Sequence, residues 1–171
     1  MTATATMVSQ QATPERAATA RSAVRTWLRL LACSNIIEGQ LRGALREKFG
    51  TTLPRFDVLA QLDSAAVESP RGLTMSELSR RLMVTNGNLT GLIDRLDREG
   101  LVSRVVAAPD RRAQMVSLTP AGKDALDSMT PDHATWVTDM FATLSDAERN
   151  QLYALLGKLK VSALTAAGRE R

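Results

Sequence analysis

The chain has 171 residues, 44% hydrophobic and 23% charged, and its 22 Lys+Arg outnumber its 18 Asp+Glu to give a net charge of +4. A chain of this length buries roughly 70% of the surface of its unfolded form, so it can fold as one domain or two small ones without disulfides or metals. No run of residues approaches the ~20 apolar positions that a membrane-spanning helix requires, which excludes a transmembrane protein.

The single cysteine and the single histidine exclude most metal and hydrolase chemistry. Cys33 has no second cysteine for an internal disulfide, and His133 alone cannot build a metal cluster. His133 also lies in a polar stretch without a nucleophile motif, so a Ser-His-Asp triad is not expected. Residues 1–14 lack the basic and apolar segments of a signal peptide. We therefore expect a cytoplasmic, mainly helical protein that is not an enzyme and needs no cofactor or metal.

The positive charge is concentrated in one quarter of the chain. Between Arg71 and Arg112 there are eight arginines and five acidic residues, and all four lysines lie elsewhere. The planar guanidinium group suits phosphates and guanine edges, whereas an ammonium is a point charge. This concentration favours nucleic-acid binding, although composition by itself also fits a solvated, salt-bridged surface.

The N-terminal part of the chain predicts a tail followed by two helices. Residues 1–14 are small and polar without a periodic apolar set, which is typical of a disordered tail. From Glu15 to Phe49, apolar residues recur every three or four positions and predict a long amphipathic helix. Pro54 opens a second helix with Phe56 and two leucines turned inward. We assign residues 15–66 to dimerisation and to the connection with the next lobe.

Residues 67–118 have the start and stop signals of a winged helix-turn-helix. After a loop, Thr74 and Glu77 form a capping box that starts a short helix. Thr85 caps a second helix that runs to Glu99, and Gly100 ends it. Two β-prone runs, 101–106 and 114–118, then predict a hairpin, the wing.

The C-terminal residues 119–171 predict two more helices. Pro120 starts the first, which Pro131 is expected to kink or interrupt, and a capping box at Ser145 starts the second, which is expected to fray after Ala163. The terminal helices have more apolar surface than one chain buries easily, so we expect a homodimer. The predicted fold is mainly α with a small β-hairpin wing, a winged helix-turn-helix embedded between dimerisation helices.

The helix from Thr85 to Glu99 has an apolar face and an opposite polar face that bears two glycines. Each glycine costs about 1 kcal/mol relative to alanine, which is unexplained unless another surface approaches the backbone closely. We expect Asp94 to be paired with Arg98, one turn later. The residues of this region expected to contact bases or phosphates are Thr85, Asn86, Gly87, Asn88, Thr90, Gly91, Arg95 and Arg98.

The tip of the predicted hairpin carries Asp110, Arg111 and Arg112. Arginines on a hairpin beside a helix-turn-helix are placed for the negative potential of an adjacent minor groove. The same residues also fit an ordinary solvated turn, because Pro-Asp is common turn chemistry. Their position after a helix-turn-helix favours the first interpretation.

Residues 73–122 resemble the winged-helix core of the MarR family of bacterial transcriptional regulators. The most specific segment is DRRAQMVSLTPAG, and LPRFDVLAQL and LSDAERNQLYALLGKLK match the flanking helices. The resemblance implies a homodimeric repressor on a pseudo-palindromic operator, with residues 86–99 in the major groove and Arg112, paired with Asp110, probing the minor groove. Gly87 and Gly91 depart from the family pattern. This departure affects which bases the helix is expected to read, and not how the protein is expected to bind DNA.

The resemblance also implies a small-molecule effector, often an aromatic or phenolic acid or its CoA thioester. It would bind between the dimerisation helices and the winged helix. Each candidate residue also fits plain core packing. The apolar and amide candidates, and the two arginines placed to pair with a negative charge, are Trp27, Leu31, Asn35, Ile36, Phe56, Arg29 and Arg42.

Two alternatives stay open. Some members of the family sense oxidants through a first-helix cysteine, but no cation adjoins Cys33 in the sequence to activate its thiol, so we expect a buried, inert thiol. A winged helix that binds proteins would expose apolar residues on its recognition face, whereas this one exposes Arg, Asn, Thr and Gly.

Overall fold

The computed structural model describes residues 14–106 and 114–168 of the chain. It consists of two compact units, residues 1–40 and 41–171, each of which is described by itself. None of the described helices is long and apolar enough to cross a membrane.

The first unit contains most of helix α1 (Pro14–Phe49). The helix predicted from residue 15 is confirmed and begins one residue earlier, at a proline whose missing N–H is not needed in the first turn. Between residues 18 and 40 no side chain is buried, although this stretch holds Trp27, Leu28 and Leu31. This part of α1 therefore has no buried apolar residue.

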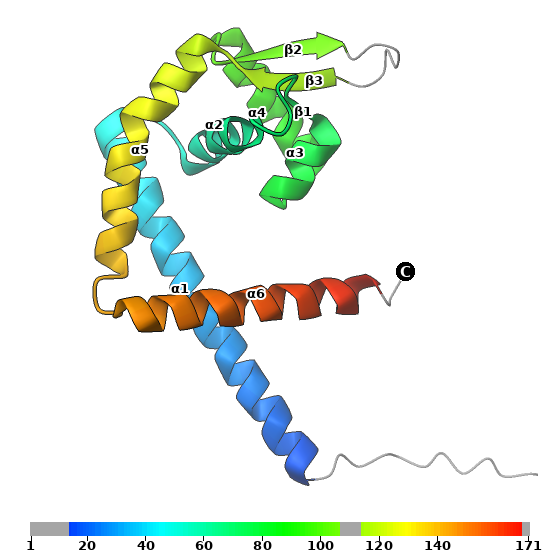
Figure 1. Cartoon of the computed structure of the whole chain (residues 1–171), viewed down its shortest axis with the longest axis vertical. Helices are drawn as coiled ribbons and strands as arrows, with labels where there is room; N and C mark the ends of the chain where they lie inside the picture. Colours follow the sequence, from blue (N-terminus) through cyan, green and yellow to red (C-terminus); the bar gives the residue numbers. More distant parts are fainter. Residues whose placement is uncertain (1–13, 107–113, 169–171) are drawn as a thin grey trace, which may run out of the picture. The chain divides into compact units, whose positions relative to one another are not determined.

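The second unit is a helical lobe with a small sheet, extended by two C-terminal helices (Figure 1). Its elements after the end of α1 are α2 (Leu53–Ala65), β1 (Leu73–Thr74), α3 (Met75–Leu82), α4 (Asn86–Arg98), β2 (Val102–Val106), β3 (Gln114–Leu118), α5 (Pro120–Met140) and α6 (Asp146–Gly168). The mainly helical fold with a winged helix-turn-helix is confirmed.

Local caps position the helix-turn-helix. The amide of Glu77 donates to Thr74 Oγ1 at 3.2 Å, and the Thr74 amide donates to Glu77 Oε2 at 2.8 Å, so the predicted capping box starts α3. Met83 ends α3 in the left-handed conformation, at φ 54°. The next helix begins three residues later, with Thr85 as its N-cap. The turn between α3 and α4 is consequently tight.

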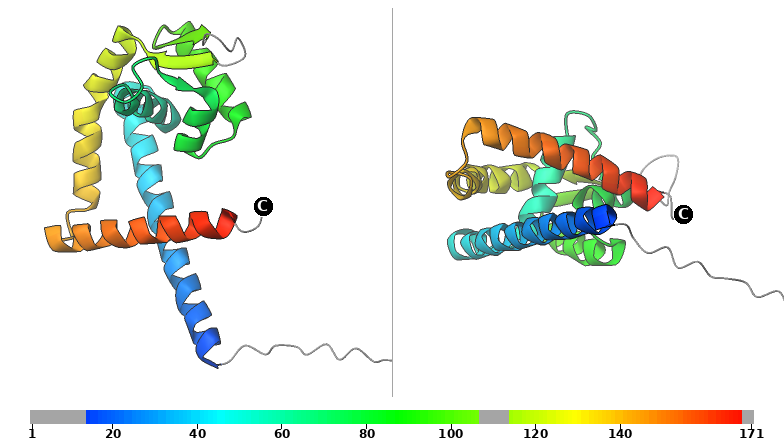
Figure 2. Two further views of the ribbon diagram at one scale, coloured as in Figure 1. Left: turned by 45° about the vertical axis from the view of Figure 1, so that its right-hand side comes forward. Right: turned by 90° about the horizontal axis from the view of Figure 1, so that it is seen from below.

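The hairpin is part of a three-stranded antiparallel sheet in the order β1-β3-β2. β2 and β3 pair from Val102↔Leu118 to Val106↔Gln114, as predicted. The sequence analysis missed β1, whose two residues are too few to show an alternating pattern, and which pairs with the other edge of β3. Figure 2 shows the strands beside the green helices α3 and α4.

Helix α5 runs unbroken through Pro131, so of the two outcomes expected there, a kink or an interruption, the interruption is wrong. Buried Leu126 and Met129 hold the helix before the proline. After it, His133 stacks on Phe56 with ring centroids 4.3 Å apart, and Trp136 meets Phe49 edge-on at 6.3 Å. Packing on both sides outweighs the one hydrogen bond that proline removes. Helix α6 likewise continues to Gly168 instead of fraying after residue 163.

Close packing joins the start of α5 to the hairpin. Thr119 Oγ1 donates to the carbonyl of Gly100 at 2.7 Å, and the Thr119 amide donates to the carbonyl of Leu101 at 3.2 Å. Gly122 lies directly over that carbonyl: a Cβ at this position would be 1.9 Å from Leu101 O. Only glycine fits this contact.

We predict that Gly122→Ala destabilises the protein by about 1–3 kcal/mol, because the added methyl forces backbone apart in a packed site. Gly91→Ala is the matched control, since a Cβ at Gly91 meets nothing within 4 Å and alanine favours a helix. Urea unfolding at fixed protein concentration measures both. Equal stability of the two variants would contradict the close packing at Gly122.

The stack of His133 on Phe56 predicts a pH-dependent stability. Burial lowers the pKa of His133 below the ordinary 6.5, so the unfolded chain takes up a proton before the folded chain does. The stabilisation is complete above pH 6.5 and is lost as the pH falls below it. Between pH 8 and pH 5.5 the wild type should lose more unfolding free energy than His133→Phe, which keeps a stacking ring but does not titrate. Equal losses would show that the imidazole does not contribute.

Candidate nucleic-acid interface

Helix α4 has one face in the core and the other in solvent. Leu89, Ile93 and Leu96 are at most 1% exposed, which holds the helix firmly against the lobe. The opposite face is wholly exposed, and every candidate predicted from this region lies there or at its N-cap: Thr85, Asn86, Gly87, Asn88, Thr90, Gly91, Arg95 and Arg98. The structure thus brings the predicted helix residues together on one accessible surface.

Hydrogen bonds to the backbone one helical turn earlier order the polar side chains of this face. Thr90 Oγ1 donates to the carbonyl of Asn86 at 2.9 Å. The Nε of Arg95 donates to the carbonyl of Gly91 at 3.1 Å, and the Nε of Arg98 donates to the carbonyl of Asp94 at 3.1 Å. Both arginine stems therefore lie back along the helix surface. Their guanidinium groups are held on the exposed face rather than extended away from it.

Packing within the chain does not require the two glycines of α4. A Cβ at Gly87 or at Gly91 would meet no atom within 4 Å. Neither residue has a positive φ, so the backbone does not demand glycine there either. Each glycine lowers the stability of the helix by about 1 kcal/mol relative to alanine, and no contact within the chain offsets this loss. The reason that remains for glycine at both positions is the close approach of a surface outside the chain.

The carboxylate of Asp94 is paired with Arg104 of β2, not with Arg98, so the predicted partner is wrong. The side chain of Arg98 bonds the Asp94 backbone instead. Arg104 also lies 3.7 Å, Nε to Oδ2, from Asp97. The sequence analysis did not assign Arg104 a role because a contact ten residues away, between a helix and a strand, has no local spacing to indicate it.

A second ion pair holds the end of α4. Arg55 of α2 donates through Nη1 to Glu99 Oε1 at 2.8 Å, and through Nη2 to the other carboxylate oxygen. This bidentate pair raises the pKa of Arg55, and the hydrogen bonds from Arg55 lower the pKa of Glu99. Glu99 is the C-cap residue of α4. The pair therefore joins the end of α4 to α2, a role that the sequence analysis also missed.

The other predicted residues belong to different parts of the chain. Asp110, Arg111 and Arg112 lie outside the described residues. The effector candidates Trp27, Arg29, Leu31, Asn35 and Ile36 are exposed on α1 in the first unit, and exposed Arg42 lies just inside the second. Phe56, in the second unit, is 6% exposed and stacked on His133.

Cys33 is exposed in the single chain, so the expectation of a buried thiol is wrong for this state. It lies in the stretch of α1 from residue 18 to residue 36, every residue of which is exposed. Among the described residues, no group of three or more His, Cys, Asp or Glu side chains is placed to hold a metal ion.

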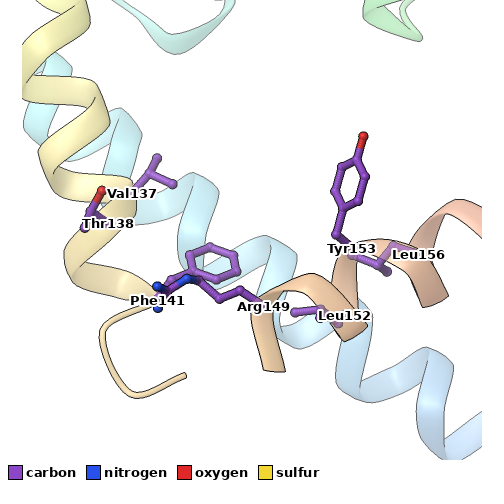
Figure 3. Close-up of a pocket in the computed structure, with 7 residues that line it drawn as sticks. All are labelled: Val137, Thr138, Phe141, Arg149, Leu152, Tyr153 and Leu156. Carbon is purple, nitrogen blue, oxygen red and sulfur yellow. The ribbon is translucent and has the colours of Figure 1, made fainter. Parts of the chain in front are cut away.

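An open hollow of about 480 Å³ lies where α5 meets α6 (Figure 3). Arg149 supplies its one charged side chain, and this guanidinium already donates to the carbonyl of Leu144 and to Asp146. The remaining lining residues are Val137, Thr138, Phe141, Leu152, Tyr153 and Leu156. None was predicted for an effector, and Tyr153 and Leu156 belong to the uncovered face of α6.

Comparisons with known proteins agree with this geometry. The sequence profile of the MarR family matches residues 49–113. An uncharacterised HTH-type transcriptional regulator of Bacillus cereus is 31% identical over 134 residues, covering 78% of this chain and 85% of the relative. The repressor YetL of Bacillus subtilis is 36% identical over 51% of this chain and 52% of its own. The transcriptional activatory protein BadR of Rhodopseudomonas palustris is 34% identical over 68% and 66%.

Solved structures share the fold. The MepR–DNA complex of S. aureus superposes with a TM-score of 0.68 at 25% identity, covering 81% of this chain and 96% of MepR. Sco3205 of Streptomyces coelicolor, a MarR family regulator solved in complex with DNA, gives 0.67 at 25% identity, covering 88% and 89%. Both are similar to this chain along nearly their whole length.

Proposed function

Because this chain belongs to the MarR family of DNA-binding transcriptional regulators, we propose that it is a homodimeric repressor. It binds a pseudo-palindromic operator and leaves it when a small aromatic or phenolic acid, or the CoA thioester of one, binds. In this proposal residues 67–118 contact DNA, while residues 15–66 and 119–171 form the dimer.

The exposed face of α4 is the observation that carries DNA binding. It combines two arginines, three amide or hydroxyl side chains and two bare glycines on a helix anchored from behind. Such side chains bond base edges and phosphates, and glycines let the backbone approach the floor of the groove. A winged helix that binds protein would expose apolar residues here, so this face favours DNA over a protein-interaction module.

The uncovered helices support the dimer. Helix α6 has no buried residue, and Leu155, Leu159 and Leu164 are about half exposed or more. The first unit exposes Trp27 and Leu28 in the same way. Apolar surface of this extent on two long helices is typical of a protein–protein interface. A second copy of the chain is the partner that a pseudo-palindromic operator requires.

The experiment is fluorescence anisotropy of the purified protein on DNA from its own upstream region and on scrambled DNA, at two salt concentrations. A panel of aromatic acids and their CoA thioesters is then added. Preferential binding that a panel member reverses supports the proposal and identifies the effector class. Binding released by peroxide in the wild type but not in Cys33→Ser would instead support oxidant sensing, and no preference for upstream DNA would overturn the regulator proposal for that region.

We predict that Gly91→Ala weakens binding to upstream DNA at least tenfold without lowering the melting temperature. The methyl group meets nothing inside the chain but stands between the helix and the groove. Anisotropy and thermal unfolding are measured on the same preparation. Unchanged affinity would mean that the backbone at this position does not approach DNA.

We predict that Arg95→Ala and Arg98→Ala each reduce the salt dependence of binding. Each phosphate contact contributes about 0.9 to the slope of log affinity against log salt. Titrations at four salt concentrations give the slopes, and Arg25→Ala, in the first unit, is the control for loss of charge. A slope that both α4 variants leave unchanged would exclude backbone contacts by these arginines.

We predict that Leu159→Glu shifts the protein toward monomers and lowers its DNA affinity at least tenfold, because a carboxylate is placed in an apolar interface. Asn150→Glu adds the same charge on the opposite side of the exposed helix α6 and should leave the dimer intact. Light scattering coupled to size exclusion gives the masses. A dimeric Leu159→Glu variant would show that this face is not the interface.

A further inference from the structure

Helix α4 is not basic by its own composition. Its two arginines are matched by Asp94 and Asp97, so residues 86–98 carry no formal net charge. The carboxylates of these two acids, however, are paired by a residue outside the helix. Arg104 is the described residue whose guanidinium reaches both carboxylates.

Arg104 is held at both ends. Its backbone lies in the middle of β2, where it is paired with Val116 of β3. Its side chain is only 20% exposed and crosses to α4, where Nη2 hydrogen-bonds Asp94. The Nε is buried without a hydrogen bond and lies 3.7 Å from Asp97. The side chain is therefore confined between a strand of the wing and two successive turns of the recognition helix.

A partly buried guanidinium that spans two elements fixes their separation more strictly than apolar contacts do, because its planar fork bonds in a few directions. A nitrogen left without a hydrogen bond is costly, and core packing gives no reason for it. An exposed ion pair with similar charges would contribute little. The Arg104 pairs thus fix the geometry between β2 and α4 more than they increase the stability of the fold.

Building on the function proposed above, we infer that Arg104 is a positioning residue for DNA recognition. It sets the distance between α4 and strand β2, so that the recognition helix and the wing meet one DNA duplex in register. Arg104 contributes through the Asp94 and Asp97 carboxylates and not through a contact of its own with bases. Its loss lowers the preference for the operator more than it lowers affinity for DNA in general.

The test is a double-mutant cycle on the full-length protein with Arg104→Met, Asp94→Asn and both changes together. The measured quantity is the ratio of the dissociation constants for scrambled and upstream DNA. We expect each single change to lower this ratio at least tenfold, and the double variant to lower it no further than Arg104→Met, because either change breaks the same link. Arg104→Lys, which keeps the charge without the fork, should restore the ratio only in part.

Several outcomes overturn the inference. If the ratio of dissociation constants falls in the double variant by the product of the two single effects, Asp94 and Arg104 act independently. If Asp94→Asn binds all DNA more tightly, its effect is the simple removal of a negative charge. Arg81→Met is the matched control, since Arg81 of α3 pairs with Glu68, which lies between α2 and β1, and its ratio should stay within twofold. Circular dichroism checks that each variant folds, and should Arg104→Met fail to fold, Asp94→Asn and Arg104→Lys give the test. If the wild-type protein binds upstream and scrambled DNA equally well, the proposed function itself is overturned.

Discussion

The burial of one side of α4 is the constraint on which the rest of the interface depends. Leu89, Ile93 and Leu96 are packed out of solvent, and each contributes roughly 1.5–3 kcal/mol of hydrophobic stabilisation. With these three residues in the core, the helix cannot rotate about its axis. The arginines, amides and glycines of the other side are consequently presented outward together, which is what a helix that enters a groove requires.

The sequence was sufficient for the start and end signals of the helix-turn-helix, which are local. The capping box at Thr74, the N-cap at Thr85 and the stop at Gly100 are short-range hydrogen-bonding patterns, and the structure has all three where they were predicted. The apolar period of α4 likewise predicted which face is buried. Because periodicity determines the exposed face, the candidate residues on α4 could be predicted from the sequence.

Interactions between distant segments could not be predicted in this way. The partner of Asp94 is a strand residue, Arg104, and the local i,i+4 rule pointed to the wrong arginine. The pairing of β1 with β3 joins segments about forty residues apart. Pro131 favours a break by its own chemistry, but packing by His133 and Trp136 overrides it.

We propose that the polar face of α4 lies in the major groove of DNA, once in each protomer of a dimer. Dimethyl sulfate protection on the upstream region tests this placement most directly, because the reagent methylates guanine N7 in that groove. We expect two protected clusters about 10 base pairs apart, or a multiple of this, and loss of both in Gly91→Ala at the same protein concentration. Binding that leaves every guanine N7 reactive would contradict it.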